Sequence, residues 1–239
     1  MKQHVGSPKE RPELADAGLA LLSFASGSMD ALAFFKLGEV FPSAMTGNTA
    51  LLGLALGQGH LTAASRPFVA FAGFLTGAAV ASAAVELWFR DLPISRAVWR
   101  LLALEVCLLA LFAFAWWFVD RSIAGDALYG LIIAASSAMG IQSVAARLVG
   151  RNGISTVVFT STLTSIVTTA TQAMLRPSQG LPVGVTTQIG MFLTYGVGAG
   201  LCGLLALHAP PMAVAALPLL AVVGAAGFHW GAGKRNSGT

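Results

Sequence analysis

One acidic residue lies deep inside an apolar stretch of this sequence: Asp30, in the run Gly27-Ser28-Met29-Asp30-Ala31. Ionisable side chains at membrane depth are costly and usually face protein or a water-filled cavity. A carboxylate there can bind a proton or a cation, or contact a substrate. It can equally be a buried acid hydrogen-bonded to a neighbouring helix, with Thr46 or Asn48 as partners. The residues leave both interpretations open.

The second distinctive feature is the polar box Met45-Thr46-Gly47-Asn48-Thr49, which follows Pro42 and Ser43. Proline and serine are typical of the start of a helix. A half-helix that begins inside the membrane would point free N–H groups and its positive dipole end at the protein centre, where they can bind an anion or a polar oxygen. The alternative is that these side chains only satisfy the broken backbone against neighbouring helices.

The second half of the chain carries a comparable polar stretch, because ten of the seventeen residues from Ser155 to Thr171 are Ser or Thr. We expect this stretch to approach the first box from the opposite face, with Gln142 opposite Asp30. The candidate substrate- or ion-binding residues are Asp30, Thr46, Gly47, Asn48, Thr49, Gln142, Thr160 and Thr162. A deeper acid in another segment, Glu105, either pairs with an arginine such as Arg100 or lines a cavity.

Composition places these residues in a membrane protein. Of 239 residues, 56% are hydrophobic and only 10% are charged, where a soluble domain carries about 25% charged residues. The mean hydropathy is +0.75, which excludes a soluble globular chain and a disordered one. The basic residues are scattered and form no nucleic-acid patch. We find no catalytic pair, metal-ligand spacing or cofactor motif, so the sequence predicts neither an enzyme nor a cofactor or metal.

Eight apolar segments divide the chain, and six are long enough, or nearly so, for the roughly 20 residues of a membrane crossing. The segments are Leu14–Phe35, Ser43–Leu56, Pro67–Phe89, Ala97–Val119, Ala127–Leu148, Ser155–Met174, Val183–Leu207 and Met212–Phe228. The second segment rises only about 21 Å, and the sixth is the Ser/Thr-rich one. The two unusual segments therefore occupy corresponding places in the chain.

Weak internal similarity predicts a duplication of about 110 residues. The box at 45–49 aligns with 159–163, Arg66-Pro67 with Arg176-Pro177, and 74–76 with 192–194, at offsets of 114, 110 and 118. We expect a first membrane repeat over 14–120 and a second over 121–230, flanked by cytoplasmic tails at 1–13 and 231–239. Chance similarity between Ala- and Leu-rich helices is the alternative.

The positive charges favour one topology. If all eight segments cross, 8 of the 14 Lys and Arg lie inside and 6 outside; if the second and sixth segments re-enter, 11 lie inside and 3 outside. The positive-inside rule prefers the second arrangement, with six full crossings and both termini in the cytoplasm. Three crossings per half make the repeat an inverted one, a common transporter plan. Eight ordinary spans remain the alternative.

The Gly27–Ala31 run, Phe41 and the Met45–Thr49 box together resemble the YoaK-like bacterial membrane proteins, a family long labelled as a domain of unknown function. Gly140-Ile141-Gln142 and Thr160-Ser161-Thr162 are similar to that family's second signature, where Ser161 departs from the expected glycine. The resemblance covers residues 14–230. It implies a multi-pass protein of the bacterial inner membrane and supplies no mechanism.

The leading functional hypothesis is a small secondary transporter of an unidentified polar or anionic solute, with its site at the interrupted helices. A channel built on re-entrant helices and a non-transporting scaffold or sensor are the alternatives. The expected partners are the lipid bilayer and a small solute or ion, with no nucleic acid. Small-xxx-small glycine pairs, which favour close helix packing within or between subunits, allow a homo-oligomer. These pairs are Gly53/Gly57, Gly73/Gly77 and Gly196/Gly200.

Overall fold

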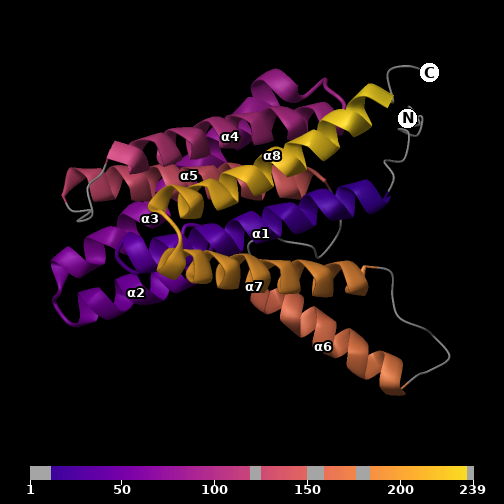
Figure 1. Cartoon of the computed structure of the whole chain (residues 1–239). Coiled ribbons are helices and arrows are strands. Elements are labelled where there is room, and N and C mark those ends of the chain that lie inside the picture. Colours follow the sequence, from indigo (N-terminus) through magenta and orange to yellow (C-terminus); the bar gives the residue numbers. More distant parts are fainter. Residues whose placement is uncertain (1–11, 119–124, 150–158, 176–183, 236–239) are drawn as a thin grey trace.

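The computed structural model describes residues 12–118, 125–149, 159–175 and 184–235, which form helices and contain no strand (Figure 1). In chain order the elements are α1 (Pro12–Lys36), α2 (Met45–Gly57), α3 (Leu61–Ala84), the π-helical turn η1 (Val85–Phe89), α4 (Ile94–Phe118), α5 (Asp126–Leu148), α6 (Phe159–Leu175), α7 (Val185–His208) and α8 (Pro211–Arg235).

Six helices are long and apolar enough to cross a membrane: α1, α3 with η1, α4, α5, α7 and α8. The remaining two described helices, α2 and α6, have only 13 and 17 residues. The predicted all-helical membrane fold, with six long helices and two short ones, is thus confirmed. Helix α2 begins at Met45 instead of Ser43, and residues 155–158 of the sixth predicted segment lie outside the described residues.

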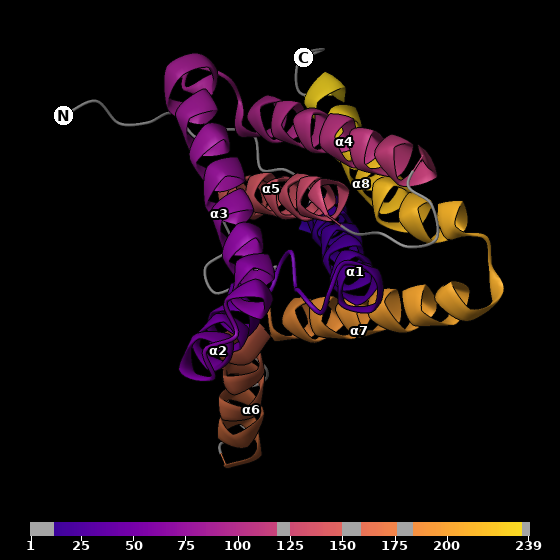
Figure 2. The same cartoon turned by 90° about the vertical axis from the view of Figure 1, so that its left-hand side faces the viewer.

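Helix α1 lies inside the bundle, where it packs against α7 and α8 and touches α5 (Figure 2). Helix α3 packs on α5, and α4 packs on both α5 and α8. The short helices lie against the long helix that follows each of them, α2 on α3 and α6 on α7. In Figure 1, α2 lies toward the end of the bundle where α1 finishes, and α6 slants away from α7 toward the other end.

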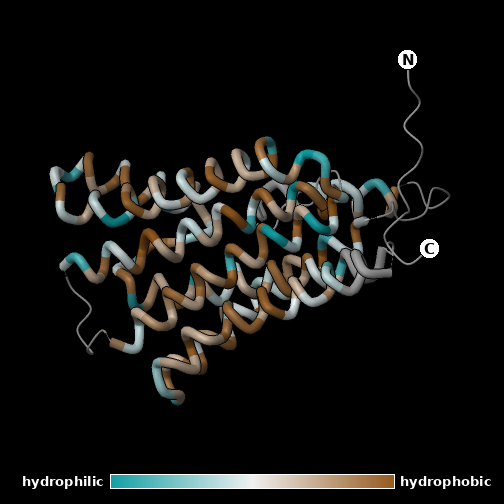
Figure 3. Tube along the Cα trace, turned by 90° about the horizontal axis from the view of Figure 1, so that it is seen from above, coloured by the Kyte–Doolittle hydropathy of each residue, from teal (hydrophilic) through white to brown (hydrophobic). Residues whose placement is uncertain are grey.

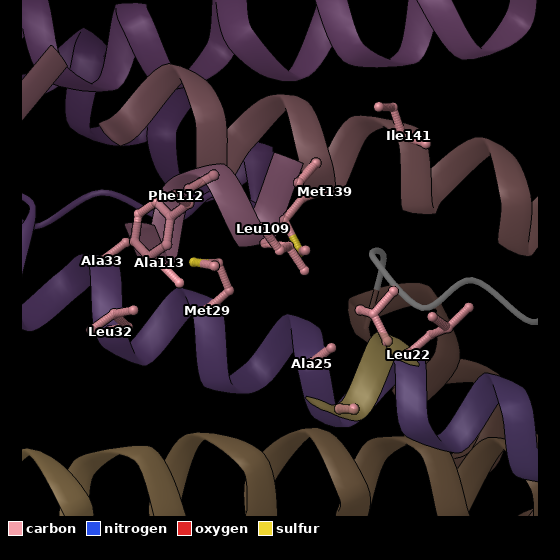
Figure 4. Packing of buried hydrophobic residues seen from close by; sticks show 14 of the residues in the cluster. Leu22, Ala25, Met29, Leu32, Ala33, Leu109, Phe112, Ala113, Met139 and Ile141 are labelled. Atoms are coloured by element: carbon pink, nitrogen blue, oxygen red, sulfur yellow. The ribbon is translucent and has the colours of Figure 1, made fainter. Parts of the chain in front are cut away.

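The core is a continuous cluster of aliphatic side chains, methionine and phenylalanine. Figure 4 shows Met29 of α1 and Met139 of α5 gathered with Leu109 and Phe112 of α4, all of them fully buried or nearly so. Hydrophobic positions continue along the length of the long helices, and several of the hydrophilic ones lie at their ends (Figure 3). Large apolar side chains also remain exposed on the outer surface, as lipid contact requires.

Helices α1 and α7 cross at a reciprocal pair of glycines. A Cβ added at Gly27 would collide with the carbonyl of Tyr195, and one added at Gly198 would collide with the carbonyl of Phe24. The Ser28 hydroxyl donates a hydrogen bond across the crossing to the Gly198 carbonyl at 3.2 Å. Only glycine permits backbones to approach so closely, so the close approach of α1 and α7 requires glycine at positions 27 and 198.

Helices α3 and α5 cross in the same way. A Cβ at Gly77 would collide with the carbonyl of Ser137, and one at Gly140 would collide with the carbonyl of Phe74. The Ser137 hydroxyl donates to the Gly73 carbonyl at 3.0 Å. The predicted close packing of the Gly73/Gly77 pair is therefore present within the chain.

The other two small-xxx-small pairs have a different environment. No neighbouring atom lies within 4 Å of a Cβ placed at Gly53, Gly57, Gly196 or Gly200. These glycines do not pack against another described helix of the same chain. Their expected role in a homo-oligomer stays a prediction.

Candidate functional site

Asp30 is buried, with 2% of its surface exposed, and its carboxylate accepts three hydrogen bonds. The backbone N–H of Ser43 donates to Oδ1 at 2.7 Å, and the Ser43 hydroxyl donates to Oδ2 at 2.6 Å. The Tyr195 hydroxyl of α7 donates to the same Oδ2 at 2.7 Å. No Lys, Arg or His of the described residues bonds to this carboxylate, so neutral donors alone stabilise it.

The carboxylate of Asp30 therefore sits at the amino end of α2, because Ser43 precedes the first residue of that helix by two positions. The sequence predicted that this half-helix would attract an anion through its N–H groups and dipole. The anion in the structure is an acid of the protein itself. Asp30 lies six residues before the end of α1, about 9 Å along the helix axis, so the non-helical segment reaches well inside the bundle.

The side chain of Asn48 bonds back to the backbone of Phe41, in the non-helical segment before α2. Its amide nitrogen donates to the Phe41 carbonyl at 2.7 Å, and its amide oxygen accepts from the Phe41 N–H at 3.0 Å. Both backbone groups of a non-helical residue are thus satisfied where water is scarce, as the membrane interior requires. The aromatic ring of Phe41 packs over Gly47, where a Cβ would come within 3.1 Å of the ring. These contacts agree with the structural interpretation of the polar box, and a binding role for Asn48 or Gly47 stays a prediction.

The two threonines of the box do not reach Asp30. Thr46 and Thr49 are exposed, and the Thr49 hydroxyl donates to the carbonyl of Met45 at 2.9 Å within its own helix. The partners that the sequence suggested for Asp30 were Thr46 and Asn48; its carboxylate is instead hydrogen-bonded to Ser43 and Tyr195. The reason is geometric, since the non-helical chain before α2 brings Ser43, not the helix, against α1.

Gln142 is buried in α5 and bonds to α1, one turn away from Asp30. Its amide nitrogen donates to the Leu22 carbonyl at 3.0 Å and to the Ser26 hydroxyl at 2.7 Å. The amide oxygen has no hydrogen-bond partner in the described chain. Gln142 therefore links α5 to α1 by hydrogen bonds. It is not part of the Asp30 cluster, which consists of Asp30, Ser43 and Tyr195.

The second polar stretch is only partly described. Thr162 is buried in α6, whereas the side chains of Thr160 and Ser161 lie outside the described residues. Helix α6 packs on α7, and α2 packs on α3. The approach of the two polar boxes from opposite faces stays a prediction.

The sequence missed two members of the cluster, Ser43 and Tyr195. Ser43 was interpreted as a helix start, although a serine that follows a proline suits a side-chain hydrogen bond in a turn equally well. Tyr195 is one of only two tyrosines in the chain. A phenol inside an apolar segment needs a hydrogen-bond partner, and this requirement was the signal available.

Glu105 forms a contrast with Asp30. It is fully buried in α4, and neither of its carboxyl oxygens has a hydrogen-bond partner in the described chain. Arg100 lies over the ring of Phe89, 5.2 Å from its centroid. Of the two expectations for Glu105, pairing with Arg100 is therefore wrong.

Comparison with known proteins places the chain in a family. A family model described as "Protein of unknown function (DUF1275)" matches residues 18–227. The chain is also 38% identical, over 156 residues, to the UPF0700 transmembrane protein YoaK of Bacillus subtilis (strain 168), an alignment that covers 62% of this chain and 64% of that relative. The resemblance inferred from the sequence motifs is confirmed. No solved structure matches the chain.

Proposed function

We propose that this chain, which belongs to the DUF1275 family of transmembrane proteins, is a small secondary transporter in which Asp30 binds the coupling proton. The observation that carries the proposal is the Asp30 cluster. One buried carboxylate of a membrane-spanning helix holds the non-helical segment before α2 and contacts α7 at the same time. Intramembrane acids in such positions commonly belong to proton and ion pathways.

Protonation of Asp30 changes the number of bonds that the cluster can make. The N–H of Ser43 can only donate, so a proton on Oδ1 crowds this N–H and weakens the hydrogen bond between them. A proton on Oδ2 must be donated to Ser43 Oγ or to Tyr195 OH, and that hydroxyl must then turn to accept it. In each case the carboxyl group loses the negative charge that strengthens the bonds donated by Ser43, so the segment before α2 is held less tightly. Binding of a proton to Asp30 is thereby coupled to movement of the short helix α2.

The glycine crossings support two related halves. Gly140 and Ser137 of α5 each lie 113 positions after Gly27 and Phe24 of α1. The partners on α7, Tyr195 and Gly198, each lie 121 positions after Phe74 and Gly77 of α3. Constant offsets at reciprocal contacts are what a duplicated unit produces. With three spanning helices per half, the second unit is inverted relative to the first.

This equivalence differs slightly from the alignment drawn from sequence. It places Ser143 opposite Asp30, one position from Gln142, and Phe74 opposite Tyr195, three positions from Phe192. The proton-binding acid and its phenol partner therefore belong to one half alone. The two halves serve different purposes, and the departure at Ser161 agrees with that.

We further propose an inner-membrane location with both termini in the cytoplasm. The distribution of 11 positive charges against 3 supports it, as does the placement of α2 and α6 toward opposite ends of the bundle (Figure 1). Single cysteines replacing Lys36 and Arg96 should react with an impermeant reagent from opposite faces of the membrane. Because position 36 is outside in both topologies, outside labelling at position 96 would contradict the re-entrant arrangement.

The transport proposal is tested in proteoliposomes loaded with the pH dye pyranine. A panel of amino acids, organic acids and sugars is applied, and solute-driven proton movement is recorded for the native protein. Asp30→Asn should abolish that movement, whereas Asp16→Asn, the same change near the start of the same helix, should retain it. Saturable counterflow separates a transporter from a channel. Proton movement in Asp30→Asn equal to that of the native protein would contradict the role of Asp30.

A further inference from the structure

A cavity of about 170 Å³ lies between the α1–α2 connection, α2 and the first turns of α3. Pockets for drug-sized ligands measure roughly 300–1,000 Å³, so this cavity suits a small solute. It is separate from the Asp30 cluster, since neither Asp30 nor its partners Ser43 and Tyr195 line it. Three features of its wall indicate what it can bind.

The first feature is a fixed guanidinium. Arg66 of α3 is half-buried and lies against Gly38, where an added Cβ would come within 2.7 Å of Arg66 Cδ and 2.9 Å of Nη1. Gly38 has a φ of +82°, a conformation that other residues rarely adopt. The described part of the chain supplies no carboxylate within ion-pair distance of Arg66. Its donors therefore remain available to a carboxylate that enters the cavity.

The second feature is an acid in the same wall, Glu39. Its φ is +64°, and it is the one non-glycine residue of the described chain with a positive φ. Backbone strain of this kind persists where the surrounding structure requires it, often at functional sites. Glu39 and Arg66 line one cavity without forming an ion pair with each other. Opposite charges that are held apart in this way match a ligand that carries both signs.

The third feature is a backbone carbonyl that can accept a hydrogen bond, together with an apolar surface. Pro67 has no N–H, so it cannot donate to the carbonyl of Ala63 in the preceding turn. Ala63 and Pro67 of α3 line the cavity, as do Leu51 and Leu54 of α2. An ammonium group can bind the carbonyl and the Glu39 carboxylate together, while the leucines contact an alkyl group.

We propose that this cavity binds a small soluble zwitterion of the amino-acid type. Its carboxylate would lie on Arg66, its ammonium group on Glu39 and the Ala63 carbonyl, and its alkyl group on Leu51 and Leu54. That such a molecule is also the transported solute rests on the proposed function. Binding itself does not, and it is measured without any flux.

Three matched ligands test the proposal on the full chain in nanodiscs of phosphatidylglycerol, whose headgroup has no ammonium group, by isothermal titration calorimetry. L-valine carries both charged groups, 3-methylbutanoate lacks the amine, and 2-methylpropylamine lacks the carboxylate. We expect L-valine to bind and each single-charge analogue to bind at least about tenfold more weakly. Equal binding of the three compounds, or binding of none, would overturn the proposal.

Variants locate the binding. Arg66→Gln and Glu39→Gln should each weaken L-valine binding at least about tenfold, while Lys36→Gln, a nearby charge that does not line the cavity, should leave it unchanged. Gly38→Ala keeps every charge but displaces the guanidinium, and it should also weaken binding. Native affinity in Arg66→Gln would overturn the assignment.

A phospholipid headgroup that joins a phosphate to an ammonium group offers related chemistry. The titration is therefore repeated in nanodiscs that contain phosphatidylethanolamine. We expect unchanged L-valine binding. Loss of the L-valine signal in those nanodiscs would mean that the lipid headgroup occupies the cavity, and it would overturn the proposal that the ligand is a soluble zwitterion. Binding without any flux in proteoliposomes would leave this site standing and reject the transport proposal alone.

Discussion

The α1–α7 crossing and the α3–α5 crossing share a backbone arrangement but not a chemistry. Each has reciprocal glycines that meet carbonyls of the facing helix, and each has one serine hydroxyl bonded across the contact. The α1–α7 crossing also carries Asp30 and Tyr195. At the equivalent places of the α3–α5 crossing stand Ser143 and Phe74, which offer neither an acid nor a phenol.

The difference separates two tasks that one helix contact can perform. Glycine fixes how closely two helices approach, and this requirement is met at both crossings. The buried acid is added at one crossing only, where a non-helical segment has to be held inside the bundle. Changes at the glycines should therefore affect both crossings alike, and changes at the polar residues should affect one.

The largest effects are expected at the glycines. Gly27→Val and Gly140→Val should each lower the free energy of unfolding by about 3 kcal/mol or more, because the added atoms meet backbone that cannot move aside. Reversible unfolding in mixed micelles measures the loss. Gly200→Ala is the control, since nothing lies within 4 Å of its added Cβ, and it should be neutral or slightly stabilising. A tolerated Gly140→Val would break the equivalence of the crossings.

Asp30→Asn should lower the free energy of unfolding by about 2 kcal/mol, because it replaces a carboxylate that accepts three hydrogen bonds with an amide that presents its own donors. Ser143→Ala, at the equivalent position, should change it by less than about 0.5 kcal/mol. The same unfolding assay compares the two variants. Equal losses would show that the acid adds nothing particular to its crossing.

Tyr195→Phe should cost about 1.5 kcal/mol, because it removes one of the three donors to Asp30 and leaves the ring in place. The reciprocal change, Phe74→Tyr, makes the other crossing resemble the first without supplying an acid. It should gain no stability. Thermal unfolding in nanodiscs, followed by intrinsic fluorescence, ranks the two variants, and a stabilised Phe74→Tyr would contradict the asymmetry.

Glu105 should show the smallest effect, with the opposite sign. Both of its carboxyl oxygens are buried without a partner in the described chain, and such groups destabilise the folded state. Glu105→Met should therefore raise the free energy of unfolding by about 1 kcal/mol, whereas Asp30→Asn lowers it. A loss of stability in Glu105→Met would mean that this acid has a bonding partner in the membrane-embedded protein.

Hydropathy and charge were sufficient to predict six long helices and two short ones, because lipid imposes a length and a composition on every crossing. Asp30 was found for the same reason, since an acid stands out in an apolar segment. Its partners were not predictable. Tyr195 lies 165 positions away in sequence, and only the fold brings it to Asp30. Ser43 was expected at the start of a helix, because sequence does not show that the residues before Met45 are non-helical and bring Ser43 to Asp30.

We propose above all that Asp30 holds the segment before α2 inside the bundle until it binds a proton. The most direct measurement is the rate at which a water-soluble maleimide labels Ala44→Cys, with Cys107 and Cys202 replaced. Each rate is divided by that of an exposed reference cysteine, Lys36→Cys, at the same pH, because maleimide reacts with the thiolate and every rate falls in acid. We expect the relative rate to be low at neutral pH, to rise in acid, and to be high at every pH when Asp30→Asn is added. Equally slow labelling with and without Asp30→Asn, at every pH, would contradict it.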